Sequence, residues 1–153
     1  MAIAYLGLGS NLGDRKGNLE DAVDALDNQL DISVTRRSDI HETKPYGNTE
    51  QPDFLNMCLE IETRMSPLSL LETVLGIEHL LGRVRTEVWG PRVIDIDILL
   101  YEDLELQLDD LSIPHHEMHK RGFVLEPLSE IAGQVKHPGF DLTIDELKDK
   151  LTV

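Results

Sequence analysis

The stretch that decides the fold is "VIDIDILLY", residues 93–101. A short apolar run rich in β-branched residues favours a buried strand. Because successive side chains of a strand point to opposite faces, Asp95 and Asp97 share one face and the isoleucines around them share the other. Two such carboxylates about 5 Å apart repel each other by about 3 kcal/mol at an effective dielectric of 20. We therefore expect a positively charged partner beside them.

Magnesium fits this pair best, because hard carboxylate oxygens are the preferred ligands of Mg²⁺. Two carboxylates can also bridge two metal ions ~3.5–4 Å apart, as in enzymes of phosphoryl transfer. Arg92, which is close in the sequence, could offset the charge instead. An exposed edge strand that merely carries acids is the other alternative. The pattern thus predicts Asp95 and Asp97 as metal ligands, with both alternatives open.

Outward from this strand, the chain alternates between predicted strands and helices. We expect further strands over residues 2–8, 32–43 and 54–63, where alternating apolar residues indicate one buried face. In the last of these, Leu55, Met57, Leu59 and Ile61 are expected to face one way, and Phe54, Asn56 and Cys58 the other.

Helices are expected from about Arg15 and between Ser66 and Gly82, which read as an N-cap and a C-cap. Their apolar stripes follow helical spacing: Leu19, Ala22, Val23, Leu26 and Leu30, then Leu70, Leu71, Val74, Leu75 and Leu81. The order β-α-β-β-α-β favours an α+β class, a ferredoxin-like antiparallel sheet with helices packed on one face. Helices near 126–132 and 143–150 form a C-terminal helical extension.

Length and composition limit the classes of protein that this chain can represent. The 153 residues suit one domain, 1–153, with a single core. Cys58 is the only cysteine, so no internal disulfide is possible, which fits a reducing cytoplasm. No run of ~18 apolar residues exists, so we expect no membrane span. With 14 basic and 29 acidic residues, a net charge of −15 should repel nucleic acid and anionic membranes.

Basic residues nevertheless gather in two windows, "RVRTEVWGPR" at 83–92 and "HHEMHKR" at 115–121. They predict a local anion site, unless both are simply solvated loops. The second window does not match the zinc motif H-E-x-x-H, because Lys120 stands at the second histidine position. A histidine that contacts phosphate beside Arg121 is the better interpretation.

Two further features carry less information. "GLGSNLGDR", residues 7–15, is neither a P-loop nor a Rossmann fingerprint, so we interpret it as a tight turn. Glu78 falls on the apolar stripe of its helix. It either escapes to solvent near the helix end or faces the sheet and orients a basic or metal-bound group.

The combination of several fragments resembles one enzyme family over nearly the whole chain. The fragments are "GLGSNLGD", "QPDFLNM", "GRVRTEVWGPRVIDIDILL" and "IPHHEMHKRGFVLEPLSEIA". Together they resemble the 6-hydroxymethyl-7,8-dihydropterin pyrophosphokinases of folate biosynthesis, whose fold is ferredoxin-like. The resemblance implies that pyrophosphate passes from ATP to the pterin hydroxymethyl group, with release of AMP.

The resemblance also implies roles for individual residues. Asp95 and Asp97 would hold two Mg²⁺ ions and count as catalytic together with Arg83 and Arg92. The implied ATP contacts are Arg83, Arg85, Trp89, Arg92, Ile98, Ser112, His115, His116 and Arg121. The implied pterin contacts are Thr43, Pro45, Tyr46, Phe54, Asn56, Trp89, Asp95 and Phe123.

Four positions depart from the family pattern as the resemblance presents it. Phe54 stands where tyrosine is common, Val88 replaces an arginine, His116 a tyrosine and Leu75 a glutamine. None of these changes removes a metal ligand, so activity is still expected. The resemblance further implies a cytoplasmic monomer whose partners are its two small-molecule substrates.

Two other functions stay open on the residues alone. A Mg²⁺-dependent phosphohydrolase would use the same carboxylates and arginines, although it would need a water-activating base that the sequence does not offer. A non-enzymatic ferredoxin-like module that binds a small ligand would explain the fold but not the charged clusters.

Overall fold

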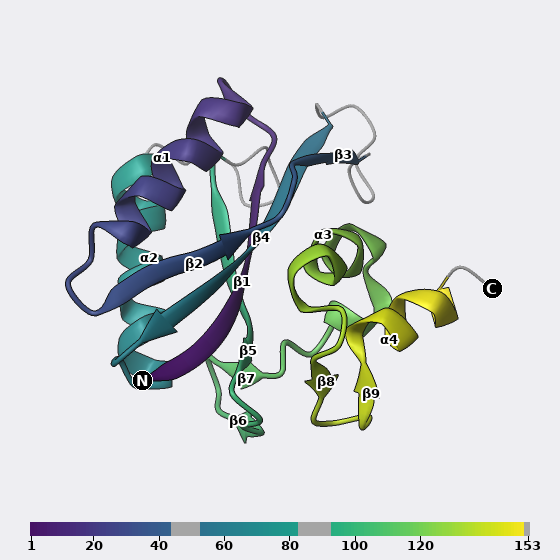
Figure 1. Cartoon of the computed structure of the whole chain (residues 1–153). Coiled ribbons are helices and arrows are strands. Elements are labelled where there is room, and N and C mark those ends of the chain that lie inside the picture. Colours follow the sequence, from purple (N-terminus) through teal and green to yellow (C-terminus); the bar gives the residue numbers. More distant parts are fainter. Residues whose placement is uncertain (44–52, 83–92, 152–153) are drawn as a thin grey trace.

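The structure is a computed structural model that describes residues 1–43, 53–82 and 93–151. A central sheet separates two helical layers, with α1 and α2 on one side and α3 and α4 on the other (Figure 1). The elements are β1 Ala2–Ser10, α1 Arg15–Asp27, β2 Ile32–Arg37, β3 His41–Thr43, β4 Phe54–Thr63, α2 Pro67–Gly82, β5 Asp95–Tyr101, β6 Leu106–Gln107, β7 Ser112–Ile113, a 3₁₀ turn at Met118–Lys120, α3 Gly122–Ala132, β8 Lys136–His137, β9 Leu142–Thr143 and α4 Ile144–Leu151.

The central sheet has the order β2-β4-β1-β5. β2 pairs with the second half of β4, and β3 pairs with the first half of β4. Every pairing in this sheet is antiparallel. This order confirms the ferredoxin-like prediction, with β2 and β3 together in the place of one strand. The expected single strand over 32–43 is therefore wrong in one respect: it breaks at residues 38–40, where the side chain of Ser38 accepts the N–H of Cys58 at 2.9 Å.

The face under α1 and α2 holds the larger core cluster, which buries most of the predicted apolar stripes. Leu30 is an exception, since α1 ends at Asp27 and leaves Leu30 98% exposed. Leu75 is also exposed, at 51%, while Ile77 takes the inward position on α2. The spacing explains this change, because Val74 and Ile77 are three residues apart and share a helix face that Leu75 does not.

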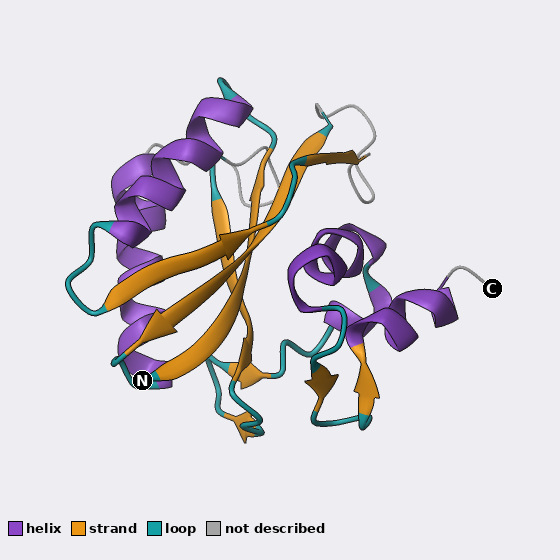
Figure 2. Cartoon of the chain, viewed as in Figure 1, coloured by secondary structure: helices purple, strands orange, loops and turns teal. Residues whose placement is uncertain are grey.

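The two helices of the β-α-β-β-α-β unit, α1 and α2, share one face as predicted, and the C-terminal helices α3 and α4 cover the opposite face. There, α3 packs against β4 (Figure 2). Residues of α3 share a second core cluster with Cys58, Leu99 and Leu100. Leu99 and Leu100 both belong to this cluster because the β1–β5 register shifts by one residue beside them. None of the described helices has the length and apolar composition that spanning a bilayer would require.

Candidate active site

The centre of the site is a flat strip of β1 between two polar side chains. Gly9 pairs across the sheet with Asn56 of β4 on one side and with Asp95 of β5 on the other. Because neighbouring strands lie about 4.8 Å apart, Asn56 and Asp95 face each other across about 10 Å of backbone with no side chain between them. A Cβ at Gly9 would lie 3.1 Å from the Asn56 side-chain oxygen and 3.7 Å from the Phe54 ring. The strip therefore depends on the glycine.

Gly7 repeats this arrangement two residues earlier. It pairs with Cys58 on β4 and with Asp97 on β5, so Asp95 and Asp97 both stand beside a glycine. Asp97 is exposed and Asp95 is half-buried, whereas the flanking isoleucines of β5 are buried in the core under α1 and α2. The predicted two-faced strand is confirmed.

The glycine-rich segment was predicted as a tight turn, and only its second half is one. Gly7 and Gly9 belong to β1, and the chain turns afterwards, around Gly13, whose φ of 72° is the left-handed region that favours glycine. The signal in the sequence was the period of two: glycines at alternate positions of a strand indicate that something approaches that face closely.

Glu78 lies against the outer edge of the aspartate strand. Its Oε2 accepts the backbone N–H of Ile96 at 2.6 Å, at the residue between the two aspartates. Since β5 is the last strand of the sheet, this N–H has no neighbouring strand to bond. Of the two interpretations of Glu78, this hydrogen bond agrees with the one in which the side chain faces the sheet. That Glu78 orients a basic or metal-bound group stays a prediction.

On the β4 side, the side chains of Asn56 and Thr43 are tied together. The Asn56 amide nitrogen donates to the Thr43 hydroxyl at 2.7 Å, which leaves the amide oxygen on the side of Gly9. Arg15 donates both to the Glu42 carboxylate and to the Asp53 carbonyl oxygen, each at 2.8 Å. The end of β3 and the start of β4 are thereby held from α1.

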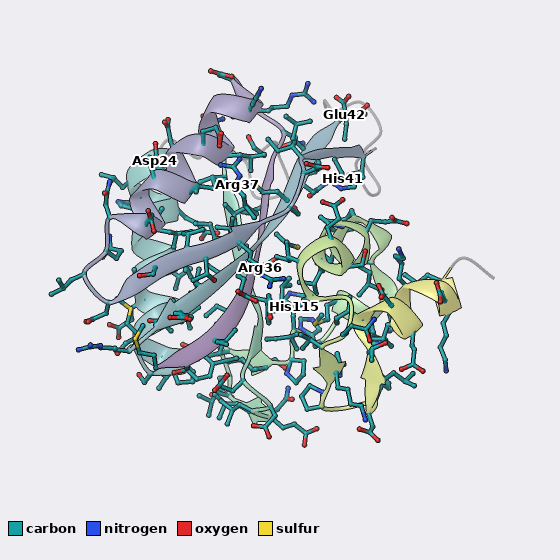
Figure 3. The ribbon with its side chains drawn as sticks, viewed as in Figure 1. Asp24, Arg36, Arg37, His41, Glu42 and His115 are labelled. Atoms are coloured by element: carbon teal, nitrogen blue, oxygen red, sulfur yellow. The ribbon has the colours of Figure 1, made fainter. Side chains whose placement is uncertain are left out.

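His115 lies between the sheet and the C-terminal helices (Figure 3). Its backbone N–H donates to the Leu99 carbonyl at 3.0 Å, and its Nδ1 accepts the N–H of Glu117 at 3.2 Å. Burial, helped by the positive charge of Arg121, lowers the pKa of His115 to about 4. The ring is therefore neutral at pH 7, with its proton on Nε2, where it can donate a hydrogen bond.

His115 opens onto a pocket of about 340 Å³ that Ser112 and His116 also line. The rings of His115 and His116 stack at 4.9 Å. The structure thus brings together three of the residues for which ATP contacts were expected. Arg121 is a fourth nearby group, since its positive charge acts on His115. Its guanidinium also lies 5.6 Å from the centre of the Phe123 ring at the start of α3.

Other expected site residues lie elsewhere. Ile98 is buried in the core under α1 and α2, so its side chain is not one of the exposed groups of the site. The remaining ones lie outside the described residues: Pro45, Tyr46, Arg83, Arg85, Trp89 and Arg92. Val88 lies outside them as well.

Within the part of the chain that the structure describes, Asp95 and Asp97 are the two carboxylates on this face of β5. Among the described residues, no group of three or more histidine, cysteine or acidic side chains could hold a metal ion on its own. A pair of carboxylates still suits Mg²⁺, which usually takes one or two protein carboxylates and completes its shell with water and substrate phosphates. The donor set therefore fits a metal that arrives with a polyphosphate.

Comparisons with known proteins agree with this chemistry. The sequence matches the family described as 7,8-dihydro-6-hydroxymethylpterin-pyrophosphokinase over residues 5–133. It is 44% identical over 144 residues to the 2-amino-4-hydroxy-6-hydroxymethyldihydropteridine pyrophosphokinase of Bacillus subtilis, covering 94% of this chain and 86% of that protein. The protein of the same name from Methylorubrum extorquens is 49% identical, covering 86% of this chain and 84% of its own. A crystal structure of Plasmodium falciparum HPPK-DHPS has a TM-score of 0.78 at 18% identity, over 97% of this chain and 43% of that one, and shows the shared fold.

Proposed function

We propose a residue-level mechanism for this chain, which belongs to the 7,8-dihydro-6-hydroxymethylpterin-pyrophosphokinase family. It is an enzyme that transfers pyrophosphate from ATP to the hydroxymethyl group of the dihydropterin. The proposal rests on one observation above all: Asn56, Gly9 and Asp95 lie side by side on three adjacent strands. A flat ring laid over Gly9 would meet the amide at one end and the carboxylates at the other.

The pterin would lie on the face of β1 at Gly7 and Gly9, with its amino and lactam edge toward Asn56. Because Thr43 already takes one N–H of the Asn56 amide, the free oxygen can accept a hydrogen bond from the pterin ring. Phe54 beside Gly9, together with Phe123 on α3, supplies aromatic surface for the ring faces. This orientation directs the hydroxymethyl arm toward Asp95.

The metal site of this mechanism is the pair Asp95 and Asp97. Two Mg²⁺ ions bound there would neutralise the triphosphate oxygens and make the transferred phosphorus easier to attack. Asp95, beside Gly9, would also be the carboxylate nearest to the attacking hydroxyl. Glu78 keeps the backbone between the two aspartates in place, so their spacing does not depend on the metal alone.

The phosphate end of ATP would meet His115, whose pocket Ser112 and His116 also line. Arg121, whose charge acts on His115, would add a second phosphate contact. A neutral His115 donates from Nε2 without bringing a second positive charge next to Arg121. The sequence resemblance adds Arg83 and Arg92 to these phosphate-binding residues. Both would stabilise the negative charge that develops as the bridge between the α- and β-phosphates breaks. Positioning and charge neutralisation carry this reaction, without a covalent nucleophile.

One assay tests the function and both alternatives. The protein is incubated with ATP, Mg²⁺ and 6-hydroxymethyl-7,8-dihydropterin, and nucleotide products are separated with and without the pterin. AMP that forms only with the pterin is the expected result. ADP or phosphate without the pterin would favour a hydrolase, and no turnover would favour a binding module. Asn56→Leu should raise KM for the pterin while leaving KM for ATP near its original value.

A further inference from the structure

Each of the three side chains of β3 is bound to a different element. His41 Nε2 lies 2.6 Å from a Glu130 oxygen on α3, Glu42 accepts from Arg15 of α1, and Thr43 accepts from Asn56 of β4. His41 and Glu42 are labelled in Figure 3. A strand of three residues at the edge of a sheet has few ladder hydrogen bonds, so these side-chain contacts decide where it lies.

Glu130 makes two contacts in this region, one with β3 and one with the break that precedes it. Its Oε1 accepts the backbone N–H of Asp39 at 2.7 Å, in the break between β2 and β3, and its Oε2 meets His41. An exposed ion pair alone contributes little to stability, and the Glu130 side chain is 33% exposed. A carboxylate that binds a backbone N–H and a ring nitrogen at once does, however, fix the direction of the chain at the break.

Glu130 lies on the same helix as Phe123, which is one of the expected pterin contacts. Phe123 and Glu130 are seven residues apart, so they lie on the same side of the helix about 10 Å from each other. α3 contacts both β3 and β4. The same helix therefore carries Phe123, which the proposed function places at the pterin, and binds β3 through Glu130.

We propose that Glu130 is a positioning residue for the pterin: by binding Asp39 and His41 it sets the gap between Phe123 on α3 and the Phe54–Asn56 wall on β4. This rests on the proposed function, because it takes the pterin to lie between those walls. Loss of Glu130 would let β3 shift, turn the Thr43 hydroxyl away from the Asn56 amide and widen the gap. ATP contacts lie elsewhere and should not change.

The test compares Glu130→Ala, Glu130→Gln and Glu126→Ala, the last being an exposed glutamate one turn earlier on α3. For each variant kcat, the KM of both substrates and Tm are measured, together with calorimetric binding of the pterin in the presence of a non-hydrolysable ATP analogue and Mg²⁺. Glu130→Ala should raise KM and Kd for the pterin roughly five- to tenfold, as expected when one ordinary hydrogen bond to the bound pterin is weakened. Glu130→Gln, which keeps an acceptor for Asp39 and a group for His41, should recover most of this loss.

Pterin constants for Glu130→Ala within twofold of wild type would overturn the inference. So would equal losses for both substrates that Glu130→Gln does not recover, since that pattern belongs to a general loss of structure. Asn56→Leu separates this inference from the function on which it rests. If Asn56→Leu weakens pterin binding and Glu130→Ala does not, only the role of Glu130 is wrong; if Asn56→Leu has no effect, the proposed pterin site is wrong.

Discussion

The carboxylate of Glu78 accepts the backbone N–H of Ile96 at 2.6 Å, between the two aspartates of β5. A helix on one face of the sheet thus holds the backbone of the strand that carries Asp95 and Asp97 on the other face. We expect this contact to affect stability and, if the proposed metal site is right, magnesium binding.

Glu78→Ala should lower the free energy of unfolding by about 1–3 kcal/mol, because a half-buried N–H loses its acceptor. It should also weaken Mg²⁺ binding, since the spacing of the aspartates is less constrained. Urea denaturation and a magnesium titration of activity measure the two effects. Glu72→Ala, an exposed glutamate on the same helix, is the control, and equal unfolding midpoints for the two variants would contradict the role of Glu78.

Gly9→Ala should weaken pterin binding tenfold or more while ATP binding changes little. The new methyl group would lie 3.1 Å from the Asn56 oxygen, and Asn56 cannot easily withdraw because Thr43 holds its other end. Isothermal titration with each substrate measures the difference. Gly76→Ala is a matched control: its Cβ meets nothing within 4 Å, and in a helix interior it should stabilise the protein by about 1 kcal/mol. Unchanged pterin affinity in Gly9→Ala would show that the pterin ring does not lie against Gly9 of β1.

Asp97→Asn should remove turnover, by about a thousandfold or more, without unfolding the protein. Asp97 is exposed, and removing its charge relieves repulsion with Asp95, so Tm without metal should stay level or rise slightly. Magnesium with a non-hydrolysable ATP analogue should raise Tm of the wild type more than that of the variant. A variant that keeps near-full activity would be incompatible with the two-carboxylate metal site.

His115 should make the protein less stable in acid. Its pKa falls from 6.5 in an open chain to about 4 in the fold, so the unfolded state binds more protons between these values. Stability should therefore decrease as the pH is lowered from about 6.5 to about 4, and the dependence from this group should level off below that. Urea midpoints of wild type and His115→Gln at pH 7 and pH 5 measure it. The wild type should lose more than the variant, and an equal loss would contradict a buried neutral His115.

The spacing of apolar residues predicted a strand or helix well where the residues of that one element were sufficient to identify its buried face. The alternation in β4 and β5 identified which side chains share a face, because side-chain direction in a strand depends only on the backbone of that strand. The same reasoning failed at Leu30, which continued a helical stripe although the helix had ended at Asp27. It also missed the break before His41, where the Ser38 side chain takes the place of a strand contact.

By itself, the sequence determined the order of strands and helices, the two faces of the aspartate strand and the class of reaction, since all three depend on residue types at short spacings. Only the tertiary structure decided that Gly9 separates Asn56 from Asp95, that Glu78 binds the edge of β5, and that Glu130 reaches β3. The physical reason is that neighbours across a sheet are set by strand order and register, which result from packing the whole core. Residues dozens of positions apart in the chain become partners only after that packing is complete.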